Sequence, residues 1–170
     1  MPVRIRPIRL WRAEVDHQPG VLAQTLEPLA AAGADLQIVM GYRVPGDRAR
    51  AAIEIFPVTG ARALSAAQAA GLSEAAISAL HVAGDNRAGL GHAIVKALAD
   101  AGINIDFFLA QVSGRRHTTV IGFDSREDAD RAIPLIKGAA AAPRKPVTRK
   151  AARKGTVGAT KRARKAARRR

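Results

Sequence analysis

Two short segments of the chain carry residues suited to binding a small charged ligand: DHQPGVL at 16–22 and DNRAGLG at 85–91. Each begins with an acid, continues with a polar side chain and reaches a glycine four residues after the acid. The unpaired N–H groups at a helix start can bind a carboxylate, and a glycine there allows close approach. Asn and Asp side chains nearby can accept hydrogen bonds from an ammonium group. The chemistry indicated is recognition of a zwitterion such as an amino acid.

The residues expected to contact this ligand come from the two segments and from the turn that follows each predicted helix. In the first copy they are Asp16, His17, Gly20, Val21, Leu22 and Asp35, and in the second they are Asp85, Asn86, Gly89, Leu90 and Asn104. Each type also has a simpler role. The glycines can merely begin a helix, the aspartates of the two segments can cap it, and asparagine suits turns intrinsically. Both interpretations stay open at this point.

The rest of the sequence argues against catalysis. It contains no nucleophile elbow, no P-loop and no dinucleotide-binding glycine motif. There is no cysteine, and the four histidines lack the spacing of metal ligands. We therefore expect a binding protein rather than an enzyme, with no cofactor and no metal.

Both segments belong to a repeat whose equivalent residues lie 69 positions apart. The acid, the glycine after it, a leucine in the following helix and the glycine that ends this helix are identical in the two copies. These pairs are Asp16 and Asp85, Gly20 and Gly89, Leu29 and Leu98, and Gly33 and Gly102. Apolar character is kept between them. A repeat of this kind predicts two copies of one structural unit.

Hydrophobic periodicity and turn residues predict the order β-α-β-β-α-β in each copy. The first copy has expected strands at 11–15, 36–40 and 53–55, with helices over 22–33 and 61–70. The second has expected strands at 80–82, 103–107 and 118–120, a helix over 90–102, and a last helix that begins at the Ser125–Asp128 capping box and ends at Gly138. Pro28 and Pro134 fall inside predicted helices and should bend them.

This order predicts an α+β fold of two tandem ferredoxin-like modules, at 1–76 and 77–138, followed by a tail at 139–170. The segment after Gly138 has no strand pattern, so the second copy lacks its last strand. An open sheet edge is normally covered. We therefore expect the edge to be short or paired, either in a homodimer or by joining the two sheets into one continuous surface.

The strings DHQPGVL and DNRAGLG, together with AGADLQI and AGINIDF after the helices, resemble ACT domains over residues 8–138. These are amino-acid-sensing regulatory modules. The second copy is especially similar to the serine-binding regulatory domain of phosphoglycerate dehydrogenase. The resemblance implies that Asn86 and Asn104 hold an effector, with His17 and Asp35 as their equivalents, at an interface between neighbouring modules. Val15 and Gly84 stand where that family has a further histidine.

The net charge of +14 is concentrated in the tail. From residue 143 onward there are thirteen Lys and Arg and no acid; the other 15 basic residues of the total of 28 face all 14 acids. The tail has few large hydrophobic residues and is expected to be disordered. Its cations suit nonspecific binding to nucleic-acid phosphates. They are Arg144, Lys145, Arg149, Lys150, Arg153, Lys154, Lys161, Arg162, Arg164, Lys165, Arg168, Arg169 and Arg170.

The sequence thus favours a cytoplasmic, non-catalytic regulatory protein that binds an amino acid or similar effector and contacts nucleic acid through its tail. No charge-free apolar stretch is long enough to span a membrane. Two alternatives remain. The folded part could serve only to dimerise an architectural nucleic-acid-binding protein, or the chain could be a detached regulatory subunit of an amino-acid biosynthetic enzyme.

Overall fold

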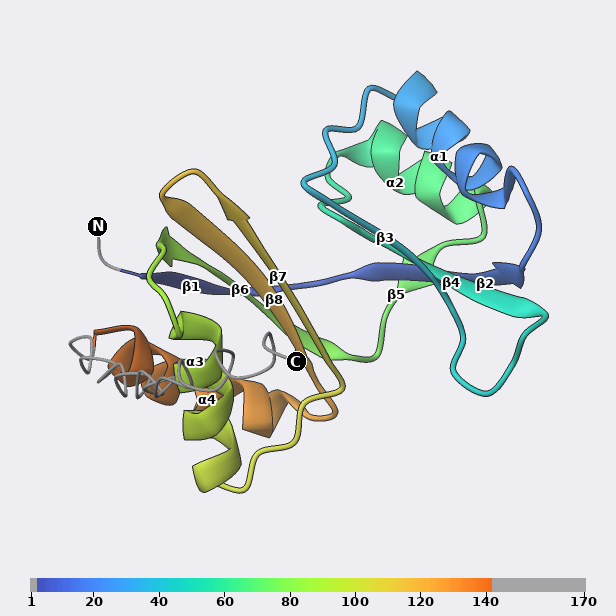
Figure 1. The fold of residues 1–170 in the computed structure, drawn as a ribbon. Coiled ribbons are helices and arrows are strands. Elements are labelled where there is room, and N and C mark those ends of the chain that lie inside the picture. The colour runs from blue at the N-terminus through green and yellow to red at the C-terminus, as the bar shows by residue number, and fades with distance from the viewer. Residues whose placement is uncertain (1–2, 142–170) are drawn as a thin grey trace, which may run out of the picture.

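A computed structural model describes residues 3–141, in which eight strands and four helices form two α+β modules (Figure 1). The strands are β1 (Arg4–Ile8), β2 (Trp11–Asp16), β3 (Ile38–Arg43), β4 (Arg50–Phe56), β5 (Ser73–Glu74), β6 (Ser78–Asp85), β7 (Phe107–Ser113) and β8 (Arg116–Phe123). The helices are α1 (Val21–Ala31), α2 (Ala61–Ala69), α3 (Leu90–Asp100) and α4 (Arg126–Ala141). The predicted pair of ferredoxin-like modules is confirmed. All thirteen basic residues of the predicted nucleic-acid contact lie outside the described residues.

The first module is an antiparallel sheet in the order β3-β4-β2-β5 with α1 and α2 on one face. Alternate residues of the central strands point toward the helices. Ala13, Ile53 and Ile55 therefore pack with Leu29 of α1 and Ala67 of α2 in one buried cluster. Small alanines on the helices bring them close to the sheet, which explains how a core with so few aromatic residues can pack.

The second module has the sheet order β1-β6-β8-β7, with α3 and α4 on one face. Leu80 and Val82 of β6 pack with Ile121 of β8 beneath Ile94 and Leu98 of α3. Both modules start and end their first helix alike. Gly20 and Gly89 precede α1 and α3 with φ of 89° and 78°, and Gly33 and Gly102 follow them with φ of 75° and 69°. These left-handed backbone angles explain why glycine recurs at these four positions.

The N-terminal strand belongs to the second sheet, although it is continuous in sequence with the first module. β1 pairs antiparallel with β6, from Arg4 opposite Ala83 to Ile8 opposite Ala79. The chain then crosses to the first sheet as β2 (Figure 1). The residues after α4, where the second copy is predicted to lack a strand, lie outside the described range; within that range β1 supplies the fourth strand of this sheet. The expected boundary at 1–76 therefore needs correction, because residues 4–8 complete the other module.

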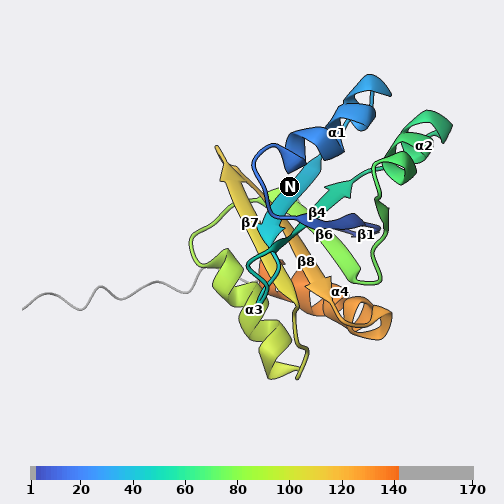
Figure 2. The same cartoon turned by 90° about the vertical axis from the view of Figure 1, so that its right-hand side faces the viewer.

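The faces of the two sheets that carry no helices meet where the chain crosses between them. Ile8 and Leu10 at the crossing pack with Ile38 of the first sheet and with Ala79 and Val120 of the second. The helix pairs consequently lie at separate ends of the molecule (Figure 2). The two sheets remain separate, so the expected single continuous surface is wrong. Since β1 covers the open edge, that edge no longer supports a homodimer, which stays a prediction.

Some element boundaries differ from those expected. The second strand of each copy begins later, at Ile38 and Phe107, because residues after each helix-ending glycine first run outside the sheet. Ser125 caps α4 as predicted, its Oγ accepting from the Asp128 N–H at 3.1 Å. The helix continues past Gly138 to Ala141, so the first residues assigned to the tail are helical. Both α1 and α4 contain their proline.

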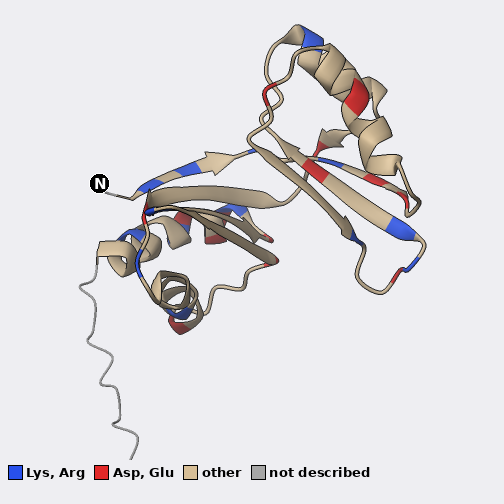
Figure 3. Cartoon of the chain, turned by 45° about the horizontal axis from the view of Figure 1, so that its top comes forward, with Lys and Arg blue, Asp and Glu red and all other residues tan. Residues whose placement is uncertain are grey.

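The charges of the described residues are spread over both modules, with acidic and basic residues interspersed (Figure 3). This agrees with the near balance of charge outside the tail. None of the helices within residues 3–141 has the length and apolar character needed to cross a membrane.

Candidate functional site

The loop that joins β2 to α1 forms one wall of a pocket of about 410 Å³ in the first module. His17, Gly20, Val21 and Leu22 line it, all of them predicted ligand contacts. The pocket lies between the start of α1 and strands β3 and β4, so part of its wall is the helix-facing side of the sheet. Its size lies within the range of small-molecule sites.

Strands β3 and β4 supply pocket residues that the sequence did not single out, chiefly Gly41, Arg43 and Ile53. Gly41 lies opposite Ile53 in the sheet, and a Cβ at Gly41 would come within 3.5 Å of Leu22. The missing side chain therefore leaves space in the pocket. Arg43 Nη2 donates to His17 Nε2 at 3.3 Å, which brings a strand cation to the loop. The order β-α-β-β predicts that this strand adjoins the loop, but not which of its residues face it.

Two predicted first-copy residues lie elsewhere. Arg50 Nη1 donates to Asp16 Oδ1 at 2.8 Å, and α1 has no side-chain cap at its start, so the capping role considered for Asp16 is wrong. Asp35 lies beyond the other end of α1, where it lines a separate pocket of about 510 Å³ with Thr59 and Arg62. Both pockets are lined by first-module residues alone.

The equivalent acid of the second module has the same cross-strand partner. Asp85 lies opposite Arg116 just as Asp16 lies opposite Arg50. The Asp85 Oδ1 and Arg116 Nη1 atoms are 3.7 Å apart. The start of α3, like that of α1, has no side-chain cap. The repeated aspartate is thus a cross-strand ion-pair residue, which accounts for its presence in both copies without a ligand.

The other predicted contact residues of the second copy lie in different surroundings. The Asn86 N–H donates to the Arg115 carbonyl at 2.8 Å, Gly89 precedes α3, and Asn104 lies exposed between α3 and β7. The Leu90 side chain is buried in the hydrophobic core, so it is not exposed to a ligand, and contact through its backbone stays a prediction. Its equivalent Val21 is only partly buried and lines the first-module pocket.

Buried polar residues in the second module take the positions of apolar pocket residues in the first. By strand register, His117 corresponds to Ala51 and Thr119 to Ile53, and both polar residues are buried. Burial, and then the nearby charge of Arg116, lower the pKa of His117 below its usual value. The imidazole is therefore neutral at physiological pH. Nearby, Arg87 Nη2 donates to the Ala139 carbonyl at 2.7 Å, which ties the loop to the end of α4.

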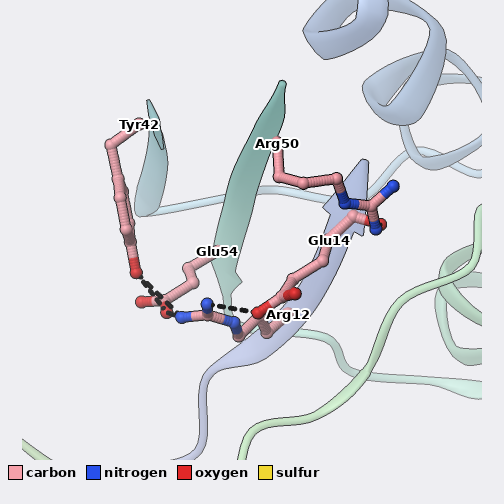
Figure 4. A network of polar contacts seen from close by, with 5 residues as sticks. All are labelled: Arg12, Glu14, Tyr42, Arg50 and Glu54. Atoms are coloured by element: carbon pink, nitrogen blue, oxygen red, sulfur yellow. Dashed lines mark hydrogen bonds and ion pairs between the residues drawn. The ribbon is translucent and has the colours of Figure 1, made fainter. Parts of the chain in front are cut away.

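A polar network occupies the helix-free face of the first sheet (Figure 4). Glu54 of β4 is fully buried, and its Oε1 accepts from Arg12 Nη1 and from the Tyr42 hydroxyl, each at 2.8 Å. Arg12 Nη2 also donates to Glu14 Oε1 at 2.7 Å. Burial, together with the hydrogen bond to Glu54, raises the pKa of Tyr42 to about 12. The network holds edge strand β3, which carries the pocket residues Gly41 and Arg43, against β4 and β2.

We expect Glu54→Ala to lower the free energy of unfolding by about 2–3 kcal/mol. Removal of one partner from a buried ion pair costs roughly 3–5 kcal/mol, and the partial exposure of Arg12 reduces that value here. Chemical denaturation measures the loss. The matched control is Glu14→Ala, which removes the other, half-exposed carboxylate from Arg12 and should cost about 1 kcal/mol or less. Equal losses for the two variants would contradict the anchoring role of Glu54.

Within residues 3–141 no group of three or more His, Asp or Glu side chains is placed to hold a metal ion. The pocket of the first module has Arg43 and His17 at one side and mostly apolar walls.

Solved structures of other proteins have a similar fold. No protein-family model matches the chain, and no curated protein sequence matches it. Among solved structures, a protein of Bacteroides thetaiotaomicron is similar with a TM-score of 0.65 at 13% identity, covering 79% of this chain and 89% of that one. The ligand-free regulatory subunit of aspartate kinase from Thermus thermophilus gives 0.56 at 20% identity, covering 82% and 97%. The two-module α+β fold is therefore shared with these two proteins over most of their length.

Proposed function

We propose that this chain is a non-catalytic regulatory protein that binds a small effector in the first-module pocket. The observation that carries the proposal is that the predicted ligand loop and an opposing strand enclose one pocket, with Arg43 and His17 at its polar side. The fold supports the proposal, since structures with the same arrangement include a regulatory subunit of aspartate kinase. The effector class is an amino acid or a similar small acid, and the setting is the cytoplasm.

Gly41→Val is expected to abolish the response to the effector without unfolding the protein. The valine side chain would occupy the pocket beside Leu22, while Gly41 has an ordinary strand backbone that a β-branched residue adopts well. The assay is a thermal-shift screen of the twenty amino acids and their 2-oxo acids on both forms. A ligand at a hundredfold excess over Kd stabilises the native state by about 2.7 kcal/mol.

Ala110→Val provides the matched control, because Ala110 is the strand residue equivalent to Gly41 in the second module. It should keep the response. Loss of the response in Ala110→Val or in Asn104→Ala, with Gly41→Val unaffected, would move the effector to the second module. No shift with any of these compounds at millimolar concentration would overturn effector binding.

A second version of the function adds an enzyme partner. The solved structures that share the fold include regulatory subunits of aspartate kinase, which favours a chain that transmits its effector signal to a separate biosynthetic enzyme. Co-purification of such an enzyme with the tagged chain, lost on addition of the effector, would support this version.

The basic tail adds nonspecific contact with nucleic acid to the proposal. Its support is the sequence, in which thirteen Lys and Arg stand without one acid from residue 143 onward. Arginine pairs well with phosphate, and backbone phosphates carry no sequence information. In the architectural alternative the tail does the binding and the folded part only dimerises. Effector binding separates the two.

A further inference from the structure

The charge of the first-module pocket is one-sided. Arg43 and His17 line it, whereas none of its lining residues is Asp or Glu. Asp16, the acid closest in sequence, is outside the lining and is bonded to Arg50. Within residues 3–141 Arg43 forms no ion pair with a carboxylate, and its one hydrogen bond goes to His17. The pocket therefore has an arginine whose charge is not balanced by the protein.

Apart from Gln18 and Tyr42, the other residues that line the pocket are apolar or glycine. Val21 and Leu22 come from the start of α1 and Ile53 from β4, while Gly41 contributes no side chain. Leu22 is 38% exposed although it is a large hydrophobic residue. An aliphatic group in the pocket would cover this side chain and gain the free energy of apolar burial.

Since the pocket combines one arginine with mostly apolar walls and no acid, we infer that its ligand is a short aliphatic carboxylate without an ammonium group, such as a branched 2-oxo acid. The inference rests on the proposed function and names the ligand class of that pocket. The guanidinium can pair with both oxygens of the carboxylate. An ammonium group would leave water with no carboxylate to receive it, which opposes binding of the corresponding amino acid.

The repeat provides an internal contrast. Val112 stands in β7 where Arg43 stands in β3, as the strand registers show. His117 and Thr119 replace Ala51 and Ile53. The combination of a free cation with an apolar wall thus belongs to the first module. The two copies have diverged at the positions that this ligand would contact.

Three compounds with the same branched carbon skeleton test the inference on the intact chain: 3-methyl-2-oxobutanoate, 3-methylbutanoate and valine. The two compounds without ammonium are expected to raise the melting temperature and to give measurable heats of binding. Valine at the same concentration is expected to do neither. Binding of valine as tight as that of the two acids, or tighter, would overturn the inference.

Substitution of the arginine tests the contact itself. Arg43→Gln should weaken binding of the oxo acid roughly tenfold or more, as expected for loss of a charged hydrogen bond. Arg48→Gln removes the same charge from the neighbouring hairpin, outside the pocket, and should leave binding unchanged. Equal affinities of the Arg43→Gln and unmodified chains would overturn the inference.

Different results would overturn the ligand class and the proposed function. A response to valine that Gly41→Val abolishes would overturn the ligand class and keep the proposed function. No response to any amino acid or carboxylate would overturn the proposed function, and the inference with it.

Discussion

A chain that begins at Arg9 is expected to lose the fold of the second module while the first module stays folded. The deletion removes β1, which exposes the ladder groups of β6 and uncovers the core against which Ile5 packs. An unpaired edge beside an open core also promotes aggregation. Hydrogen exchange should show loss of protection in β6 and β8 and retained protection in β2 and β4. A synthetic peptide of residues 1–10 should restore protection by strand addition.

Two substitutions in the complete chain separate the packing of β1 from its mere presence. Ile5→Asp places a charge against the second-module core and should destabilise that module strongly. Arg4→Gln changes the adjacent, exposed residue and should have little effect. Native protection of β6 in the chain that begins at Arg9 would show that the second module needs no fourth strand.

A chain that ends at Ala141 is expected to lose nucleic-acid binding and keep its fold. The truncation removes thirteen Lys and Arg and lowers the net charge from +14 to about +1. For the full chain, neutralising 6–10 phosphates predicts a fall in affinity of roughly 10³–10⁵-fold between 50 and 200 mM salt. Fluorescence anisotropy with two unrelated duplexes measures both effects. The two duplexes should bind alike, because contacts are to backbone phosphates.

The matched control keeps the composition of the tail and scrambles its order after Ala141. This variant should bind like the natural chain, since only charge and length enter the argument. If the chain that ends at Ala141 binds as tightly as the full chain, the folded modules are the nucleic-acid partner. Both truncated and scrambled forms should keep the thermal response to the effector.

The sequence predicts the modules because their determinants are local. The glycines at both ends of α1 and α3 and the alternating apolar residues of the central strands specify each unit within a short stretch of chain. The pairing of β1 with β6, in contrast, cannot be predicted from local sequence. Arg4–Ile8 alternates weakly and contains Pro7, which suits an edge strand, but nothing local says that the edge belongs to β6. Pairing between segments so far apart in the sequence depends on which sheet edge is open once the other strands have paired.

The candidate site divides in the same way. The loop residues His17 and Gly20 are recognisable from sequence because their types and spacing carry the chemistry. Gly41 and Arg43 line the pocket with these loop residues only because of their positions in β3. Asp16 lies outside the pocket lining and forms a cross-strand ion pair with Arg50. Glu54 is the one charged residue in the segment AAIEIF of β4, and this was the sequence signal for its polar network. The composition of the chain does not identify the partners of Glu54.

The order of synthesis makes the pairing of β1 with the second module important during folding. Of the described elements β1 is synthesised first, and its partner β6 follows only after the elements of the first module. Until then β1 is a strand without a sheet, and such exposed strands are prone to aggregate in incompletely folded chains. Three of its five residues are Arg4, Arg6 and Pro7, the residue types that keep free strands from pairing wrongly. The composition of β1 is thus suited to a strand that is synthesised well before its partner.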